Sequence, residues 1–201
     1  MRRGHVALAV ASGSELRAQD AATRLLAFAV EPGCVPAQAF AGVLAQFGTL
    51  CLPAPELQRL AERHFPDAVA LVVHLDMGLP KALRQRLDEV DDVRELLLEF
   101  RRPASQDATW LASAVAVGCL GDNHLWQDLG LPHRQALSQL LREHFPALCE
   151  RNTGDMKWKK FLYKQLCERA AVQCRAPSCA VCSDYGFCFG PEEGPTRPVR
   201  G

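Results

Sequence analysis

The sequence predicts an all-α fold, a single helical domain followed by a C-terminal cysteine-rich metal-cluster loop. The 201 residues are 48% hydrophobic and only 7% aromatic, with Ala and Leu dominant, and this mixture favours helices over strands. Apolar residues recur at three- and four-residue steps, and no segment sustains the alternation of a strand. Nine cysteines are present, and four of them fall within fifteen residues near the C-terminus. A chain this long and apolar can bury a core without disulfides.

Proline and glycine punctuation divides the chain into expected helices. They cover residues 15–30, 36–46, 55–64, 81–101, 105–120, 132–144 and 155–171. The 81–101 segment shows the helical period most clearly, with apolar residues at Leu83, Leu87, Val90, Val93, Leu97 and Phe100. We therefore divide the chain into a mobile N-terminus (1–14), a helical domain (15–171), a cysteine-rich cluster-binding segment (172–190) and a disordered tail (191–201).

The net charge is balanced, with 23 basic and 23 acidic residues, which argues against a dedicated nucleic-acid binder. The start of the chain has the character of a signal peptide, but its apolar stretch is short and charges follow at once from Glu15. The longest apolar run elsewhere, 111–120, is shorter than the roughly 20 residues that cross a bilayer. We expect a cytoplasmic protein with no nucleic-acid or membrane partner. In that compartment clustered cysteines indicate metal or redox chemistry.

The expected helices 55–64 and 132–144 share a pattern at their ends. Leu57-x-x-Leu60-x-x-x-His64-Phe65-Pro66 matches Leu137-x-x-Leu140-x-x-x-His144-Phe145-Pro146. One interpretation is a common stop signal, because a proline disfavours helical conformation in the residue before it. The other is a duplication that produced two related helical hairpins.

The cysteine cluster carries the clearest functional signal. Its spacing is Cys174-x4-Cys179-x2-Cys182-x5-Cys188. Thiolates are soft ligands that select zinc, copper(I) or iron–sulfur clusters. Structural zinc sites generally combine two Cys-x2-Cys knuckles, and only one is present here. The asymmetry favours an iron–sulfur-type cluster, with zinc and free or disulfide-bonded cysteines as the alternatives.

The five remaining cysteines differ in the residues that surround them in the sequence. Cys167 ends the last expected helix, seven residues before the cluster, and is a fifth candidate ligand. The other four lie in apolar surroundings and are interpreted as buried structural cysteines: Cys34, Cys51, Cys119 and Cys149.

The helix before the cluster holds four of the five lysines in the chain. On a helical wheel Lys157, Lys160 and Lys164 form one line, with Cys167 beside it. The line is either a solvated face or a cationic stripe. A stripe of this kind would offset the negative charge of a thiolate cluster, and it would attract an anion such as molybdate or an acidic partner surface.

A set of motifs over roughly Cys119 to Glu193 resembles the NifQ family, which handles molybdenum in nitrogenase cofactor assembly. The resemblance lies in the run from Gly121 to Leu131 (Gly-Asp-Asn-His-Leu-Trp-Gln-Asp-Leu-Gly-Leu), His144-Phe145-Pro146, Asn152, the run from Met156 to Phe161 (Met-Lys-Trp-Lys-Lys-Phe), Cys167 and the four-cysteine cluster with its following Phe189-Gly190-Pro191-Glu192. The first hundred or so residues carry no motif of this kind.

The resemblance implies a carrier of a molybdenum–iron–sulfur cluster (iron, sulfide and molybdenum), not an enzyme. It implies that Cys174, Cys179, Cys182 and Cys188 are the cluster ligands. Implied partners are the cofactor-assembly scaffold, the nitrogenase iron protein and a molybdate source. We expect three cysteines to hold iron and one position, Cys188 or Cys167, to be exchangeable.

His124 has two interpretations. It is either structural, in the first turn of a helix capped by Asp122 or Asn123, or a contact for the cluster or molybdate.

Two other functions are alternatives to a metal-cluster donor. They are a zinc-stabilised protein-interaction module and a redox-active molybdate-processing protein. The second would need electrons, and the nucleotide-binding pattern Gly-x-Gly-x-x-Gly is absent from the sequence.

Overall fold

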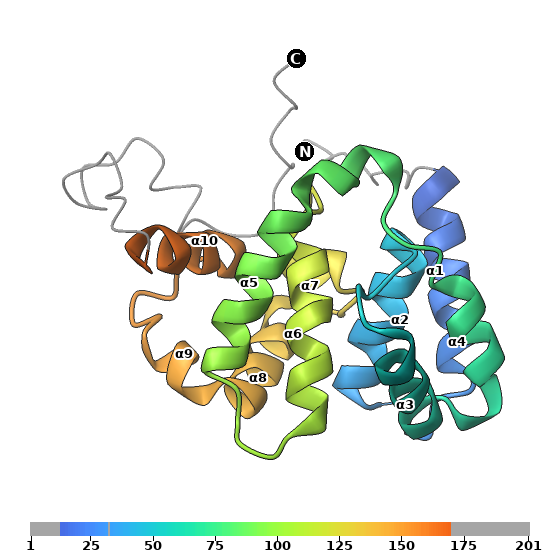
Figure 1. Cartoon of the computed structure of the whole chain (residues 1–201). Coiled ribbons are helices and arrows are strands. Elements are labelled where there is room, and N and C mark those ends of the chain that lie inside the picture. The colour runs from blue at the N-terminus through green and yellow to red at the C-terminus, as the bar shows by residue number, and fades with distance from the viewer. Residues whose placement is uncertain (1–12, 32, 170–201) are drawn as a thin grey trace, which may run out of the picture.

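The computed structural model describes residues 13–31 and 33–169, and over these residues the chain forms a single helical domain without strands (Figure 1). The predicted all-α class is therefore confirmed for this part of the chain. The cysteine-rich segment 172–190, the tail 191–201 and residues 1–12 of the expected N-terminal segment lie outside the described residues. No helix in the described part is long and apolar enough to cross a membrane.

The helices follow one another with short connections. In chain order they are α1 (Gly13–Leu26), α2 (Val35–Phe47), α3 (Ala54–His64), the 3-10 turn η1 (Pro66–Ala68), α4 (Val69–Leu75), the 3-10 segment η2 (Lys81–Arg86), α5 (Leu87–Glu99), α6 (Gln106–Cys119), α7 (Leu125–Asp128), α8 (Arg134–His144), α9 (Pro146–Glu150) and α10 (Trp158–Arg169). Each of the seven expected helices is present, with its ends shifted by a few residues.

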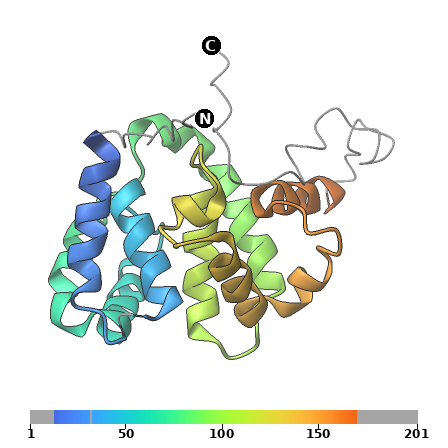
Figure 2. The ribbon, with the colours of Figure 1, turned by 180° about the vertical axis from the view of Figure 1, so that it is seen from behind.

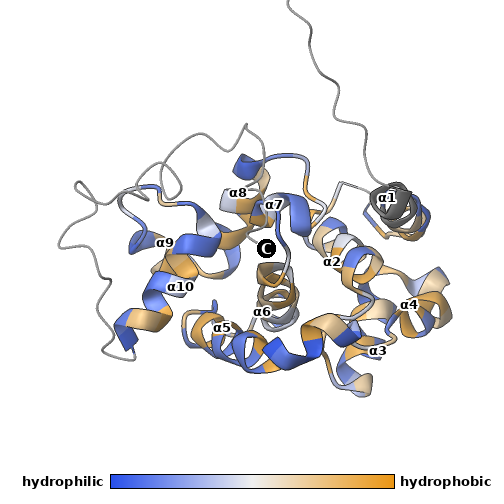
Figure 3. Ribbon diagram, turned by 90° about the horizontal axis from the view of Figure 1, so that it is seen from above, coloured by the Kyte–Doolittle hydropathy of each residue, from blue (hydrophilic) through white to orange (hydrophobic). Residues whose placement is uncertain are grey.

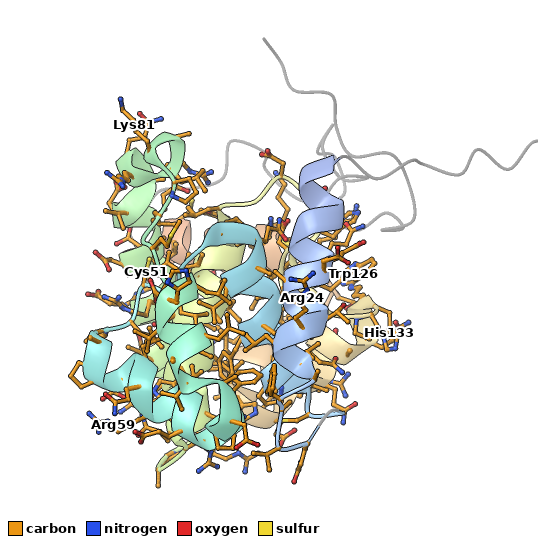
Figure 4. All side chains as sticks on the ribbon, turned by 90° about the vertical axis from the view of Figure 1, so that its right-hand side faces the viewer. Arg24, Cys51, Arg59, Lys81, Trp126 and His133 are labelled. Carbon is orange, nitrogen blue, oxygen red and sulfur yellow. The ribbon has the colours of Figure 1, made fainter. Side chains whose placement is uncertain are left out.

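Three differences from the expected helices have local causes. The 81–101 segment opens as 3-10 turns, because the Leu83 N–H bonds to Pro80 O at 2.8 Å, and its α-helix begins only at Leu87. The last helix begins at Trp158 instead of residue 155, because Asp155 adopts a left-handed φ of 50°. The helix 132–144 begins at Arg134, because Nδ1 of His133, at the surface in Figure 4, accepts the Ala136 N–H at 3.1 Å.

Helix α6 is the centre of the core. Every residue from Trp110 to Cys119 is buried, which explains the apolar run that the sequence shows there. A helix that is apolar on all sides is stable only when neighbours surround it. Figure 3 shows α6 near the middle of the molecule, with α2, α5, α7 and α8 around it.

Two similar three-helix units meet at this core. In the first, α1 and α2 form a hairpin with α3 following, and Figures 1 and 2 show α1 at the outer edge beside α2. In the second, α5 and α6 form the hairpin and α8 is the third helix. The units join where α2 packs against α6.

The shared His-Phe-Pro ending has the same geometry in both units. Phe65 and Phe145 have nearly equal backbone angles, φ −139° and ψ 56° against φ −135° and ψ 53°. The carbonyl of His64 accepts the backbone N–H of Val30 at 3.1 Å, and that of His144 accepts the N–H of Arg102 at 2.7 Å. Each donor lies in the turn of its own hairpin. A stop signal alone does not require this bond, so the structure favours the duplication interpretation.

The two histidines differ in their partners. His64 Nε2 lies 3.0 Å from Oδ1 of Asp107, the second residue of α6. The second residue of α2 is Pro36, which offers no such group. Within the described residues neither ring nitrogen of His144 has a hydrogen-bond partner, although His144 is only 6% exposed. Burial lowers the pKa of His144 below 6.5.

A close crossing of backbones joins the units near α7. A Cβ on Gly42 of α2 would lie 2.7 Å from the carbonyl carbon of Leu129 and 2.8 Å from Cα of Gly130. Gly130 itself has a left-handed φ of 67°. Only glycine at position 42 allows α2 to approach the end of α7 this closely.

We predict that Gly42→Ala destabilises the fold by about 1–3 kcal/mol, because the added methyl group meets backbone atoms that cannot rotate away. Urea unfolding followed by circular dichroism measures this. Gly33→Ala is the matched control, since a Cβ there meets nothing within 4 Å. Equal midpoints for Gly42→Ala and Gly33→Ala would contradict the close crossing.

His144 predicts a pH dependence of stability. Below pH 6.5 the unfolded chain binds a proton on this imidazole, whereas the folded chain does not until lower pH, so the free energy of unfolding falls as the pH drops below 6.5. His144→Leu should flatten the slope of urea midpoint against pH between about pH 5.5 and 7.5. His74→Gln, at an exposed position, should leave the slope as it is. A wild-type slope in His144→Leu would show that another group is responsible.

Candidate functional site

The predicted site residues fall on both sides of the boundary of the described residues. Cys174, Cys179, Cys182 and Cys188 lie outside them. Cys167 lies in the last turns of α10 and is exposed. The described part of the chain thus ends with the helix that leads into the cysteine-rich segment.

Lys160, Lys164 and Cys167 are exposed on α10 at steps of four and three residues, which places them along one side of the helix. Lys164 Nζ lies 3.6 Å from Oε1 of Glu168. Lys157 is half-buried and comes just before the helix, where its carbonyl accepts the Phe161 N–H at 2.9 Å. The structure therefore brings together two lysines of the expected stripe with Cys167, and places the third at the helix entrance.

The helix near His124 begins one or two residues later than expected, so His124 precedes its first turn. It is itself the N-cap of α7, and its backbone N–H donates to Oε1 of Gln127 at 3.1 Å. Asn123, one of the two expected caps, instead donates its side-chain amide to Oδ1 of Asp128 at 3.1 Å. This gives His124 a structural role at the start of α7.

Asp128 is a buried charge bonded to α10, and the sequence analysis did not single it out. Its side chain is fully buried and forms an ion pair with Nζ of Lys159 on α10. Oδ1 of Asp128 also accepts from Gln46 Nε2 at 2.9 Å. Lys159 Nζ makes a second bond, to the carbonyl of Gly121 at 2.7 Å. A buried charge persists only when it is paired and hydrogen-bonded in this way.

Gly121 makes room for this ion pair. A Cβ at position 121 would overlap the carboxylate of Asp128. The first glycine of the Gly-Asp-Asn-His motif is therefore explained by the space that the Asp128 side chain occupies.

A second polar cluster joins α10 to α5. Arg86 holds Glu89 with two bonds, Nε to Oε1 at 2.6 Å and Nη2 to Oε2 at 2.8 Å, and donates to Leu120 O at 3.0 Å. The hydroxyl of Tyr163 on α10 donates to Glu89 Oε2 at 2.8 Å. The bonds from Arg86, with help from Tyr163, lower the pKa of Glu89, so the carboxylate stays charged and keeps accepting.

Two further contacts fix the ends of α10. At its start, Trp158 Nε1 donates to Ser138 Oγ of α8 at 2.9 Å. At its end, Arg169 Nη2 lies 3.1 Å from Oε2 of Glu99 of α5. Together with Lys159 and Tyr163, these contacts hold α10 against α5, α7 and α8 and leave the side with Lys160, Lys164 and Cys167 exposed.

The cysteines inside the domain are poor ligands. Burial raises the pKa of the thiol of Cys119, between the two polar clusters, to about 12, and that of Cys149 to about 11. Burial also raises the pKa of Cys34 and Cys51. Metals bind the thiolate form, so the raised pKa values agree with a structural role. The expected burial is correct for Cys119, whereas Cys34, Cys51 and Cys149 are only partly buried.

Within residues 13–31 and 33–169 no group of three His, Cys, Asp or Glu side chains is arranged to hold a metal ion. What this part of the chain offers is a firmly held helix with an exposed thiol and two exposed cations, immediately before the cysteine-rich segment. The expected cluster ligands follow it in the sequence.

Sequence reasoning missed Lys159, Asp128 and Gly121, although all three stand in motifs that it quoted. A signal was available, because Trp158 and Leu162 mark the apolar line of α10 and Lys159 is adjacent to that line. The partner of Lys159 could not be identified, since 31 residues separate it from Asp128.

Comparison with known proteins gives a consistent result. The NifQ family model matches residues 33–190. A protein NifQ of Rhodobacter capsulatus is 34% identical over 179 residues, which cover 82% of this chain and 96% of that protein. A protein NifQ of Azotobacter vinelandii is 50% identical over 111 residues, 55% of this chain and 57% of that protein. One from Klebsiella pneumoniae is 45% identical over 144 residues, 57% of this chain and 86% of that protein.

The matched part of this chain thus spans little more than half the length of the Azotobacter protein and nearly all of the Rhodobacter protein. No solved structure matches the chain.

We predict that breaking the Lys159–Asp128 pair costs far more than removing an exposed lysine. Lys159→Met leaves a buried carboxylate unpaired and Asp128→Asn leaves a buried ammonium unpaired, so each should lower the free energy of unfolding by about 3–5 kcal/mol. The double variant should lose less than the sum, because neither charge is then left alone. Lys160→Met is the control and should change stability by less than about 0.5 kcal/mol. Equal effects at positions 159 and 160 in urea unfolding would contradict the anchoring role.

Proposed function

The chain belongs to the NifQ family, and from this premise we propose that it is a carrier of a molybdenum–iron–sulfur cluster that donates molybdenum for assembly of the nitrogenase iron–molybdenum cofactor. The proposal places the protein in nitrogen fixation. Its cargo is the cluster itself, so the protein acts as a donor and not as an enzyme.

The observation that carries the proposal is the four-cysteine motif inside the matched range. The family model extends over residues 33–190 and so includes Cys174, Cys179, Cys182 and Cys188. Four thiolates in so short a segment suit the iron and sulfide of a cluster, because soft ligands select such metals.

The geometry of α10 supports this role. A cluster with thiolate ligands carries negative charge, and the exposed Lys160 and Lys164 would offset part of it. The exposed thiol of Cys167 is available as a ligand that can be exchanged. The Lys159–Asp128 pair and the Tyr163–Glu89 bond hold α10, the helix that precedes the cysteine-rich segment in the sequence.

A donor must release what it binds. We propose that three of the four cysteines hold iron and that the remaining position, Cys188 or Cys167, is the exchangeable one next to molybdenum. The receiving partners would be the cofactor-assembly scaffold and the nitrogenase iron protein, with molybdate as the source of the metal, all in the cytoplasm.

We predict that protein purified without oxygen is brown and contains iron, sulfide and molybdenum. Alanine at Cys174, Cys179, Cys182 or Cys188 should lower the metal content, and alanine at the exchangeable position should lower molybdenum more than iron. Inductively coupled plasma mass spectrometry of each variant measures the two metals separately. Cys34→Ser is the matched control, because serine suits its N-cap position at α2.

Two outcomes would contradict this proposal. A colourless protein with one bound zinc would indicate a zinc-stabilised interaction module. Equal losses of iron and molybdenum in every cysteine variant would show that no cysteine is an exchangeable position distinct from the iron ligands.

A further inference from the structure

A polar cavity of about 500 Å³ lies between α10 and the loop that connects it to α9. Side chains from Lys164, Gln165 and Glu168 line it on the α10 side, with Phe161 beside them. Arg151 and Thr153 line it on the loop side. Asn152, Met156 and Phe161 of the family-like motifs also line it, and the sequence analysis gave none of these residues a role in a cavity.

Arg151 is held in place by an aromatic ring and keeps its donors available. Its guanidinium carbon lies 4.3 Å from the centre of the Phe100 ring. Stacking of this kind uses the face of the guanidinium, so its N–H groups, which lie in the plane, stay free to donate. No hydrogen bond or ion pair joins the Arg151 side chain to another residue of the described part.

The α10 side of the cavity supplies a second cation and a competing carboxylate. Lys164 Nζ lies 3.6 Å from Glu168 Oε1, and both side chains are about half exposed. Glu168 also accepts from Gln165 Nε2 at 2.6 Å, and Gln165 is only 8% exposed. Among the described residues of the lining, two cations stand against one carboxylate, which gives a positive balance.

We propose that this cavity binds molybdate, a tetrahedral oxyanion with two negative charges. The guanidinium of Arg151 and the ammonium of Lys164 provide charged N–H donors from opposite walls, and the Thr153 hydroxyl provides a neutral one. The volume exceeds that of the bare ion, so water molecules fill the remainder. The inference rests on the proposed function for the choice of molybdate over other oxyanions, and involves binding only, with no covalent or redox step.

The position of the cavity suits delivery to the cysteine-rich segment. Lys164 precedes the exposed Cys167 by three residues on α10, which is one turn of the helix. An anion held by Lys164 is therefore concentrated beside the exposed thiol of Cys167, the fifth candidate ligand.

The test is a calorimetric titration of the full-length protein with sodium molybdate, without oxygen and after molybdenum has been removed. Arg151→Gln and Lys164→Gln should each weaken binding about tenfold or more, because each removes a charged hydrogen-bond donor. Glu168→Gln should tighten binding by roughly two- to fivefold, because it removes the competing carboxylate. This gain cannot arise from misfolding. Arg142→Gln, an exposed arginine of α8 outside the cavity lining, should leave the affinity unchanged.

Several results would overturn the inference. The first is that the wild type does not bind molybdate, and the second is that Arg151→Gln binds it with wild-type affinity. The third is that Lys160→Gln loses as much affinity as Lys164→Gln, which would mean that the whole positive side of α10 attracts the anion. An equal affinity for sulfate would overturn the choice of molybdate.

The titration also separates this inference from the proposed function. A variant with serine at positions 174, 179, 182 and 188 should still bind molybdate, because it keeps Arg151, Thr153 and Lys164, the residues proposed to bind the anion. If the wild type binds molybdate through Arg151 but holds no molybdenum–iron–sulfur cluster, the donor role fails and the cavity stands. If the cluster forms and Arg151→Gln binds molybdate normally, only the cavity assignment fails.

Discussion

The ion pair between Lys159 and Asp128 is the contact on which the position of α10 depends. It places a lysine of the last described helix in the protein interior, where a fully buried carboxylate receives it together with two amide groups. Such a pair tolerates little movement, because any separation leaves a charge without compensation in an apolar setting. The glycine at 121 and the glycine at 42 both serve this region, since one makes space for the carboxylate and the other lets α2 approach the end of α7.

The duplicated arrangement of helices explains why the interior is so well defined. Two hairpins pack through α2 and α6, and in each unit the third helix closes on its own hairpin turn through one backbone hydrogen bond. The second unit then departs from the first: α7 is inserted between α6 and α8, and α10 is added beside α5. The added parts carry two of the motifs that resemble the NifQ family, at α7 and α10, whereas His144-Phe145-Pro146 belongs to the repeated core.

Helix α10 is held firmly on its inner side and is exposed on its outer side. Inward-facing groups of α10 are bonded to α5, α7 and α8, and its outward side presents two lysines, a thiol and one wall of a polar cavity. Rigid support would suit the proposed carrier role, because binding groups that are already in place lose little entropy on binding. The exposed lysines of α10 attract anions.

The sequence alone determined the helical class, the positions of the seven longer helices and the family, because periodicity, proline punctuation and cysteine spacing are local properties. It missed α4, whose Val-Ala-Leu-Val-Val-His-Leu run has no helical period and follows the end of α3. Only the tertiary structure decided that Lys159 faces the buried carboxylate of Asp128, that His124 caps α7, and that Arg151 and Lys164 line one cavity. These facts depend on residues far apart in the chain, and a pattern along the sequence does not specify which of them meet.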